Sequence, residues 1–306
     1  MHTGGSDPTV LSTLSDQLAN AVERAGQSVV RVEARRGRAG SGVAWSADGL
    51  ILTADHVLER DEDLVIGLPD GRRSSARIVG RDPGTDLALL RVEGAALTPA
   101  EQASAPRVGQ LVLVVARPDR SLATSLGVVG ALGGPVRTWR GGRLASFIST
   151  DAIFYPGYSG GPLVDVSGRM LGLATSRFGR GQGAGLAIPL ESVKQSAEAL
   201  LSHGRIRRGY LGISSQPVAL PAGLRGAAGL EQETGLLIVG VESGGPAERG
   251  GLLVGDILVT LGGEAVGDTD DLRDLLGPER LGQTVPTRVI RGGQPHDLSL
   301  TVGERP

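Results

Sequence analysis

Short apolar runs separated by turn residues fill most of the chain after residue 28, and they constrain the fold more than any other feature. Turn signals such as Ala47-Asp48-Gly49 and Pro69-Asp70-Gly71 divide the runs. Many short strands with regular turns are typical of an all-β barrel or sandwich. The runs include Val29–Val32, Gly42–Trp45, Leu64–Leu68, Ala76–Val79 and Leu111–Val115.

Two stretches show helical spacing instead, Val10–Ala25 and Leu190–Leu201. A polar, glycine-containing stretch follows the second of them, and the length of 306 residues allows two domains. We therefore expect four parts: an N-terminal tail and helix (1–27), a β-rich domain (28–203), a linker (204–209) and a smaller second domain (210–306).

The segment Tyr155–Leu163 places one serine, Ser159, on a glycine-rich turn just before an apolar run. Glycine tolerates backbone angles that let neighbouring N–H groups converge. Two such groups beside a serine hydroxyl form a nucleophile with its own oxyanion hole. A plain tight turn fits the segment equally well, because the chain has 49 glycines. A suitably placed histidine and aspartate would favour the nucleophile.

One of the four histidines, His56, ends a strongly apolar run, whereas the others lie in polar or turn segments. Asp86 stands at the head of another apolar run. The order His56, Asp86, Ser159 is that of a chymotrypsin-type triad. In such a triad Ser159 would attack a carbonyl, His56 would transfer the proton and Asp86 would orient the imidazole. The N–H groups of Gly157 and Ser159 would bind the oxyanion.

Several segments in this order resemble the HtrA (Deg) family of serine proteases, from about Leu18 to Val302. The resemblance implies a mainly β fold: a chymotrypsin-like double β-barrel, the trypsin-like serine protease domain, plus a C-terminal PDZ domain that is β-rich with short helices. It also implies an ATP-independent endopeptidase of protein quality control that cleaves unfolded or damaged proteins. The matching segments are Gly40–Val43, Ile51–Val57, Thr85–Leu90, Thr150–Ala152, Gly160–Leu163 and Gly185–Pro189.

Residues 210–306 resemble a PDZ domain of the HtrA kind in four segments. An extended peptide adds to an exposed strand edge of such a domain, with its terminal carboxylate in a nest of backbone N–H groups. The resemblance therefore implies unfolded polypeptides and protein C-termini as partners. The expected peptide-binding residues are Tyr210, Leu211, Gly212, Ile213, Leu272 and Leu276. The alternative is that the leucines are ordinary core and the glycine a plain turn.

The residues just before the nucleophile, Ala152–Tyr155, carry no charge. In trypsin-like folds they floor the primary specificity pocket, where a buried lysine or arginine would lack a counter-charge. We therefore expect small or medium aliphatic residues at the cleavage site, with Phe154 and Ala184 as wall residues.

The chain departs from the family pattern in three places. Tyr158 stands where an asparagine usually precedes the nucleophile, and Val115–Pro118 replaces a glycine-asparagine-proline pattern. Residues 1–35 contain no aromatics, although N-terminal aromatics typically hold family trimers. The resemblance implies a homotrimer, for which Leu11, Leu14 and Leu18 are candidate aliphatic contacts.

Composition excludes other classes of protein. Acidic and basic residues are intermixed with a net charge of −2, which disfavours nucleic-acid binding. The absence of cysteines and the scattered histidines predict no metal site, and we expect no cofactor. The sequence contains neither a signal-peptide pattern nor an apolar run of membrane-spanning length. We expect a cytoplasmic chain, or a cell-envelope one from which a signal or anchor was removed.

Two other functions compete with the endopeptidase. The first is a proteolytically inactive, chaperone-like peptide-binding protein in which Tyr158 misplaces the oxyanion donors. The second is an esterase, which would share the triad chemistry but fits the barrel pattern and the PDZ domain poorly.

Overall fold

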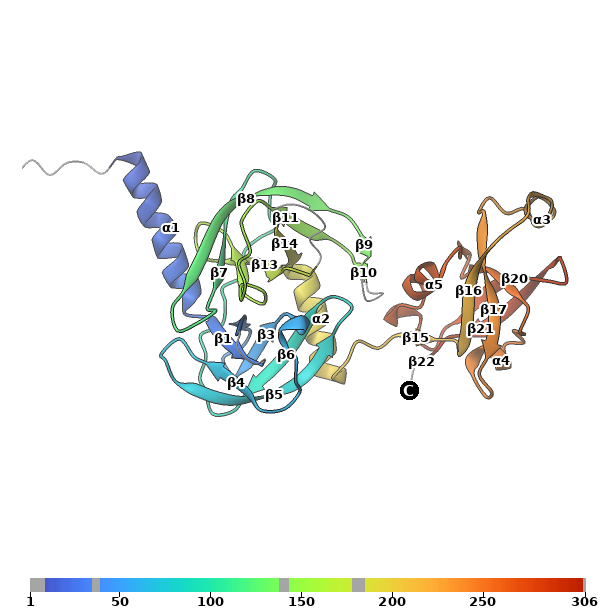
Figure 1. Ribbon diagram of the computed structural model, residues 1–306, viewed down its shortest axis with the longest axis horizontal. Coiled ribbons are helices and arrows are strands. Elements are labelled where there is room, and N and C mark those ends of the chain that lie inside the picture. Colours follow the sequence, from blue (N-terminus) through green and yellow to red (C-terminus); the bar gives the residue numbers. More distant parts are fainter. Residues whose placement is uncertain (1–8, 35–38, 138–142, 178–184, 305–306) are drawn as a thin grey trace, which may run out of the picture. The chain divides into compact units, whose positions relative to one another are not determined.

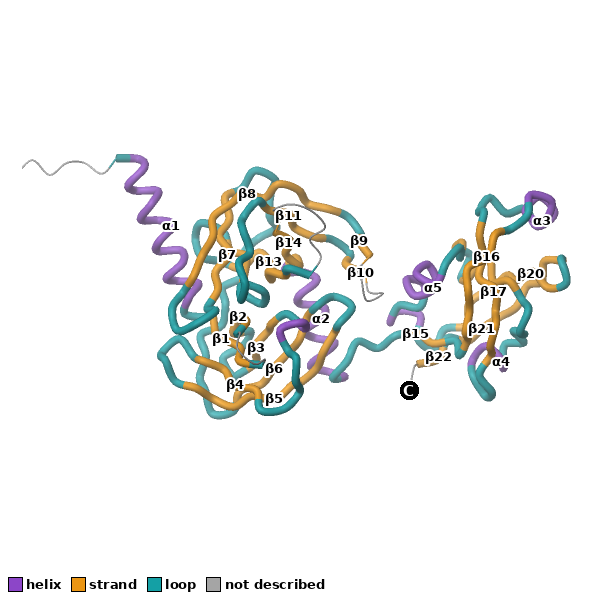
Figure 2. Tube along the Cα trace, viewed as in Figure 1, coloured by secondary structure: helices purple, strands orange, loops and turns teal. Residues whose placement is uncertain are grey.

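The computed structural model describes residues 9–34, 39–137, 143–177 and 185–304 (Figure 1). The chain separates into two compact units, Met1–Ile206 and Arg207–Pro306. Strands and loops dominate both units (Figure 2).

The first six strands of unit 1 close into a barrel in the order β1-β2-β3-β6-β5-β4. All pairings are antiparallel, and valine, isoleucine and leucine side chains such as Val32, Ile51 and Leu90 fill the interior. The strands are β1 (Val29–Glu33), β2 (Gly40–Ala44), β3 (Leu50–Thr53), β4 (Leu64–Gly67), β5 (Arg73–Asp82) and β6 (Leu87–Val92). The short 3-10 helix η1 (Asp55–Val57) follows β3.

A second closed barrel has the order β11-β14-β13-β12-β7-β8. Its interior is also aliphatic, with Tyr158 as its one buried aromatic side chain among the described residues. The strands are β7 (Leu111–Ala116), β8 (Ala123–Gly133), β11 (Phe147–Thr150), β12 (Pro162–Val164), β13 (Met170–Thr175) and β14 (Gly185–Pro189). Strands β9 (Val136–Arg137) and β10 (Arg143–Leu144) form a separate two-stranded sheet.

Two helices cover unit 1. Helix α1 (Val10–Gly26) begins at the N-cap Thr9, whose side chain accepts a hydrogen bond from the Ser12 N–H, and its C-terminal half packs against β7 and β1. Helix α2 (Leu190–His203) buries one face on residues from both barrels and ends at Gly204, which has a φ of +70°. A left-handed C-cap of this kind favours glycine.

Unit 2 is a six-stranded antiparallel sheet with short helices. The main path is β16-β17-β18-β20-β21, so β16 lies at one edge, and β19 pairs with β18. The strands are β16 (Ile213–Ala219), β17 (Thr234–Val241), β18 (Ile257–Leu261), β19 (Glu264–Ala265), β20 (Thr284–Arg291) and β21 (Gln294–Thr301). Strands β15 (Gly209–Tyr210) and β22 (Gly303–Glu304) form a separate pair. The helices are α3 (Ala222–Ala228), α4 (Pro246–Arg249), α5 (Thr269–Leu275) and the 3-10 helix η2 (Pro278–Arg280).

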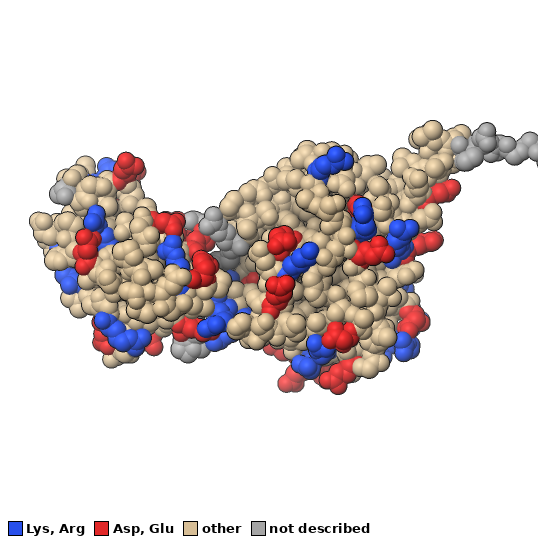
Figure 3. Space-filling view, turned by 180° about the vertical axis from the view of Figure 1, so that it is seen from behind, with Lys and Arg blue, Asp and Glu red and all other residues tan. Residues whose placement is uncertain are grey.

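The structure confirms the predicted fold class, a mainly β double barrel followed by a smaller β-rich unit. Within the described ranges, none of the helices combines the length and hydropathy that a membrane crossing requires. Figure 3 shows acidic and basic side chains mixed over the visible face of each unit.

Candidate active site

Strand pairing in the first barrel brings His56 beside Asp86. Strand β3 ends where its antiparallel neighbour β6 begins, with Thr53 opposite Ala88. His56 lies in the 3-10 helix just after β3, and Asp86 lies just before β6. The Asp55 N–H donates to the Asp86 carbonyl at 3.1 Å, which holds the two segments together.

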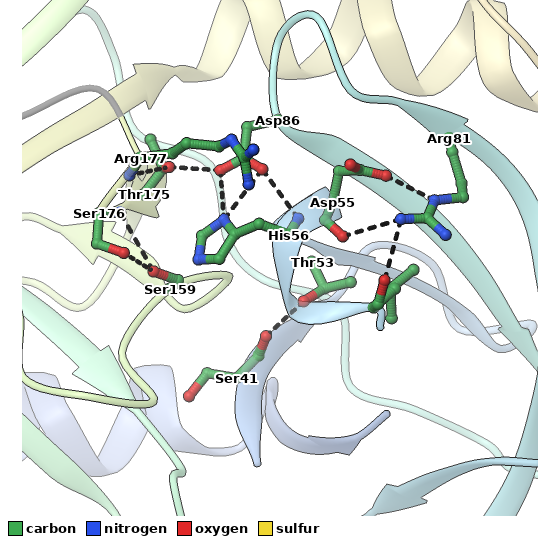
Figure 4. A network of polar contacts seen from close by, with 11 residues as sticks. Ser41, Thr53, Asp55, His56, Arg81, Asp86, Ser159, Thr175, Ser176 and Arg177 are labelled. Carbon is green, nitrogen blue, oxygen red and sulfur yellow. Dashed lines mark hydrogen bonds and ion pairs between the residues drawn. The ribbon is translucent and has the colours of Figure 1, made fainter. Parts of the chain in front are cut away.

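Asp86 is completely buried and accepts bonds from two sides. Its Oδ2 lies 2.7 Å from His56 Nδ1 and 2.5 Å from Thr175 Oγ1, and its Oδ1 lies 3.0 Å from the His56 backbone N–H. A carboxylate only accepts, so His56 Nδ1 carries the proton and Nε2 is left as the base. Figure 4 shows the imidazole between Asp86 and Ser159, with its far edge turned toward Ser159.

Asp86 also has an uncommon backbone. Its φ of +59° lies in the left-handed region, which few residues other than glycine adopt. In this conformation the carboxylate contacts the Nδ1 side of the His56 imidazole.

Ser159 lies on the turn that precedes β12. The Tyr158 N–H donates to the Tyr155 carbonyl at 3.0 Å, and Gly157 has a φ of +91°. Positive φ at the third residue defines a type II turn, which requires glycine there. Ser41 of β2 fixes the same turn from the first barrel, because its Oγ donates to the Gly157 carbonyl at 2.7 Å and its N–H to the Ser159 carbonyl at 3.1 Å.

Two N–H groups of this turn have no acceptor within the part of the chain that the structure describes. The N–H groups of Tyr158, Gly160 and Gly161 donate to backbone carbonyls. Those of Gly157 and Ser159 donate to none among the residues the structure describes. Ser159 is 6% exposed, and buried N–H groups are rarely left unpaired in folded proteins. The two predicted oxyanion donors are therefore the ones available to a ligand oxygen.

The hydroxyl of Ser159 contacts a residue that sequence reasoning missed. Its Oγ lies 3.0 Å from Ser176 Oγ and accepts the Ser176 N–H at 3.2 Å (Figure 4). Ser176 follows Thr175 directly, so the end of β13 touches both the nucleophile and Asp86. The N–H can only donate, so it occupies one lone pair of Ser159 Oγ.

The two barrels meet closely at Gly160. A Cβ atom there would collide with the Ser41 carbonyl oxygen and would lie 2.5 Å from Thr53 Oγ1. Thr53 in turn donates to the same Ser41 carbonyl at 2.7 Å. Gly160 thus allows the serine turn to lie against the segment that carries His56.

Tyr158 occupies the core and leaves the site open. Its side chain is 5% exposed, packs inside the second barrel and donates to the Thr124 carbonyl at 3.3 Å. Burial raises the pKa of this phenol, and Tyr155 adds to the shift. The bulk of Tyr158 therefore points away from the oxyanion donors.

Arg117, part of the second departure from the family pattern, is also buried. Its N–H donates to Ser41 Oγ at 2.9 Å, which orients the hydroxyl that holds Gly157. Its guanidinium donates to the Val29 carbonyl at 2.8 Å and to the Gly26 carbonyl at 3.1 Å. Burial lowers the pKa of Arg117.

An ion pair fixes the 3-10 helix that carries His56. Arg81 Nε lies 2.6 Å from Asp55 Oδ1, and its Nη2 donates to the carbonyls of Asp55 and Leu58 (Figure 4). Burial opposes the charge of Arg81, but the carboxylates of Asp55 and Asp61 outweigh this and raise its pKa. Asp55 itself is 2% exposed.

Of the predicted specificity residues, the structure describes Phe154, which packs half-buried against the second barrel core and lies beside Gly185. Ala184 lies outside the described residues. Ala152 is buried, whereas Ile153 and Tyr155 are each 52% exposed.

The predicted peptide-binding residues of unit 2 gather around the start of β16. Leu211 and Gly212 are buried, and Gly212 has a φ of +76°. Their carbonyls accept from Ala247 and Glu242, but their N–H groups donate to none of the described residues. Tyr210 donates from its hydroxyl to the Glu242 carboxylate, and Ile213 begins the edge strand.

The predicted pocket leucines of unit 2 lie in its core. Leu272 and Leu276 are 7% and 8% exposed, in one apolar cluster with Leu211. Helix α5, which carries Leu272, lies against β16.

Ser41, Thr175, Ser176 and Arg81 are the residues of the site that sequence reasoning did not single out. The Gly40-Ser41-Gly42 motif was visible as part of the resemblance, but nothing local to it indicates contact with residue 157. The described residues contain no cluster of three or more histidine and acidic side chains suited to a metal ion.

Comparisons with known proteins agree with this geometry. Residues 40–173 match the trypsin-like peptidase domain, and residues 209–302 match the PDZ domain. Probable periplasmic DegP-like serine endoproteases of Ectopseudomonas mendocina and Pseudomonas putida are 35% and 34% identical over 275 residues. These residues are 87% of this chain and 56% of each relative, so the chain spans about half the length of the curated relatives it matches.

Solved structures match nearly the whole chain. The HtrA-type protease AlgW with a decapeptide superposes with a TM-score of 0.73 at 31% identity, covering 94% of this chain and 99% of that one. A serine endoprotease from Yersinia pestis gives a TM-score of 0.73 at 30% identity, covering 94% and 98%.

The fold and the site together define a trypsin-like serine peptidase domain joined to one PDZ domain. The chain belongs to the HtrA family of serine proteases.

Proposed function

We propose that this chain is an ATP-independent serine endopeptidase of protein quality control that cleaves unfolded or damaged proteins. One observation carries the proposal: the N–H groups of Gly157 and Ser159, which donate to none of the described residues, flank a hydroxyl that faces the His56–Asp86 pair. A nucleophile, a base with an orienting carboxylate and two oxyanion donors are the parts that acyl transfer needs.

The chemistry follows from these positions. Ser159 Oγ adds to the peptide carbonyl carbon while its proton passes to His56 Nε2, and the carbonyl oxygen takes the negative charge between the two N–H groups. His56 then gives the proton to the amine as the C–N bond breaks. Water repeats the sequence on the acyl-enzyme and releases the acid. Asp86 keeps Nδ1 protonated and stabilises the imidazolium.

The side of the site that holds the substrate is apolar. Phe154 packs against the second barrel beside Ala152, and the segment from Ala152 to Tyr155 contains no charge. Small or medium aliphatic side chains fit such a floor, whereas lysine and arginine would lose hydration without a counter-charge. Efficient cleavage after basic residues in a peptide panel would refute this preference.

The PDZ unit is proposed to bind the C-terminal ends of unfolded polypeptides. The buried N–H groups of Leu211 and Gly212, which donate to no residue that the structure describes, are suited to a carboxylate, and β16 is an edge strand of the described sheet beside them. The related AlgW was solved with a tripeptide as well as a decapeptide. Leu272 and Leu276 back this nest through their contacts in the Leu211 cluster.

Assembly and location complete the proposal. Val10 and Leu11 of helix α1 are 85% and 77% exposed, and Leu14 is 36% exposed, so this face is suited to a homotrimer contact. A monomer in sedimentation at working concentration would refute the trimer. The curated relatives are described as periplasmic, which supports a cell-envelope location.

Casein cleavage tests the activity. The wild-type chain is expected to degrade unfolded casein without ATP, and Ser159→Ala is expected to abolish the cleavage while leaving the fold intact. Ser167→Ala, in the turn between β12 and β13, is the matched control and is expected to retain full activity. If casein survives under every condition while peptides still bind, the chain is the chaperone-like binding protein and not a protease.

A further inference from the structure

The edge strand β16 carries a proline, Pro217, in the middle of its length. Edge strands expose unpaired N–H and C=O groups, to which an extended peptide can add. Proline has no N–H and is therefore confined to places where no donor is needed. The direction in which Pro217 faces decides whether it affects a docked peptide.

The neighbouring strand fixes that direction. The Ile238 N–H donates to the Asp256 carbonyl at 2.8 Å, and the Ile238 carbonyl accepts from Gly255 at 2.9 Å. Both main-chain groups of Ile238 therefore face away from β16. Ile238 lies opposite Ser215, so the main-chain groups of Ser215 also point away from β17, toward the free edge.

The main-chain groups of successive strand residues point to opposite sides, so the direction found for Ser215 fixes that of the other residues of β16. The register shift omits Val239 of β17, so the extra residue belongs to β17 and β16 alternates without interruption. The Gly212 carbonyl accepts from Glu242, and the Leu220 N–H donates to Glu233, each at 2.8 Å. The even-numbered residues thus face β17, and the odd-numbered ones face the free edge: Ile213, Ser215, Pro217 and Ala219.

A peptide that adds antiparallel to β16 meets these residues in order. With its carboxylate at the Leu211 and Gly212 N–H groups, its last residue lies opposite Ile213 and its third-last opposite Ser215. Its fifth-last residue lies opposite Pro217, where the ladder lacks the donor for the ligand carbonyl. Main-chain pairing is complete up to the fourth-last residue, and at the fifth-last residue it loses the hydrogen bond that an N–H of residue 217 would donate.

We propose that Pro217 sets the length of the segment that the PDZ unit binds, limiting recognition to about the last four residues of a polypeptide with a free C-terminus. The inference rests on the proposed peptide docking. The PDZ unit would then favour chain ends, because a longer segment loses the hydrogen bond from residue 217 and gains little affinity from pairing past it. Pro217 is exposed, as the free edge requires.

Calorimetry on the full-length Ser159→Ala chain tests the limit. The probes are nested peptides of three, four, six and eight residues that share a C-terminal valine with a free carboxylate. For the chain with Pro217, affinity should rise from three to four residues and then stay level. For Pro217→Val, it should rise again with six residues, by about fivefold for one regained hydrogen bond.

Two further variants separate the causes. Pro217→Ala restores the N–H with a smaller side chain and should give the same rise, which would show that the rise does not come from the valine side chain. Pro295→Val changes a proline of β21, at the opposite edge of the sheet, and should leave the level profile unchanged.

Three results would overturn the inference. The first is an affinity that keeps rising from four to eight residues with Pro217 present. The second is an affinity that stays level with peptide length in both Pro217 variants while these variants self-associate. Pro217 would then only protect the β16 edge from pairing with another copy. The third is no binding of any probe by the parent chain, which would refute peptide docking itself.

Discussion

The two barrels of unit 1 hold their shares of the active site by different means. The first barrel fixes His56 and Asp86 with charges and side-chain hydrogen bonds, including the Arg81–Asp55 pair behind them. The second barrel positions Ser159 mainly through backbone geometry, with the left-handed Gly157 and the core packing of Tyr158, and Ser41 of the first barrel adds a hydrogen bond to that turn. Catalysis should therefore be most sensitive to the loss of a charge near His56 and Asp86, and to added side-chain volume near Ser159.

Removing the charge of the triad carboxylate should have the largest effect. Asp86→Asn keeps the shape but lets the amide stabilise the wrong imidazole tautomer, so kcat/KM on a peptide substrate should fall by about 10⁴-fold. Asp16→Asn, on the exposed face of α1, changes the same charge away from the site and should leave kcat/KM unchanged. A loss of less than tenfold in Asp86→Asn would mean that the first barrel does not act through this charge.

Adding one carbon to the serine turn comes next. A Cβ at Gly157 would lie 2.7 Å from Pro118 Cβ and 3.0 Å from the Ala39 carbonyl oxygen, at a φ of +91°. Gly157→Ala should turn the N–H away and lower kcat by about 10²–10³-fold, as for the loss of one oxyanion donor. Gly134→Ala meets no neighbour within 4 Å and serves as the control in the same barrel. Equal kcat values for Gly157→Ala and Gly134→Ala would contradict the assignment of the Gly157 N–H as an oxyanion donor.

Breaking the ion pair behind His56 should cost less. Arg81→Met leaves Asp55 buried and without its cationic partner, and should lower the free energy of unfolding by about 2 kcal/mol. This is less than the roughly 3–5 kcal/mol lost when a fully buried ion pair is broken, because Arg81 is 29% exposed. The expected accompanying loss of kcat would come from a looser His56. Urea unfolding and peptide turnover measure the two effects.

The same strand supplies the control for that change. Arg77 also lies on β5, but its partner Glu93 is 81% exposed at 3.7 Å. Arg77→Met should alter stability by less than about 0.5 kcal/mol. If the two variants are equally destabilised, the Asp55 pair has no special role in holding the helix of His56.

The difference between the barrels also explains what the sequence could predict. Strand runs, both long helices and the residues His56, Asp86 and Ser159 carry local signals, such as an apolar run ending in histidine or a serine among glycines. Ser41 and Ser176 carry none, because their contacts with Gly157 and Ser159 join segments 116 and 17 residues apart. The first contact depends on how the two closed barrels meet, and the second on how β12 and β13 pair within one barrel, and no local pattern encodes either.

Tyr158 illustrates the same limit. From the sequence, a tyrosine beside the nucleophile left open an inactive protein in which Tyr158 misplaces the oxyanion donors. The side chain instead fills the second barrel and reaches the Thr124 carbonyl. Whether a bulky residue next to Ser159 points inward or outward depends on the volume available in that core, and the sequence does not give it.

The smallest expected effect is the loss of that one hydroxyl. Tyr158→Phe keeps the packing and removes the bond to Thr124, so stability at neutral pH should fall by about 1 kcal/mol with little change in kcat. Burial raises the pKa of this phenol in the folded state. The contribution of the neutral phenol to the stability of the fold is therefore complete below about pH 10 and is lost as the pH rises through the folded-state pKa. Phenylalanine cannot ionise, so the difference in free energy of unfolding between the parent chain and Tyr158→Phe should shrink as the pH rises. Urea unfolding at alkaline pH measures this difference. Tyr155→Phe, at the exposed end of the turn, should leave that alkaline loss in place. A large fall in kcat for Tyr158→Phe would instead show that the nucleophile half depends on a polar contact, as the acid–base half does.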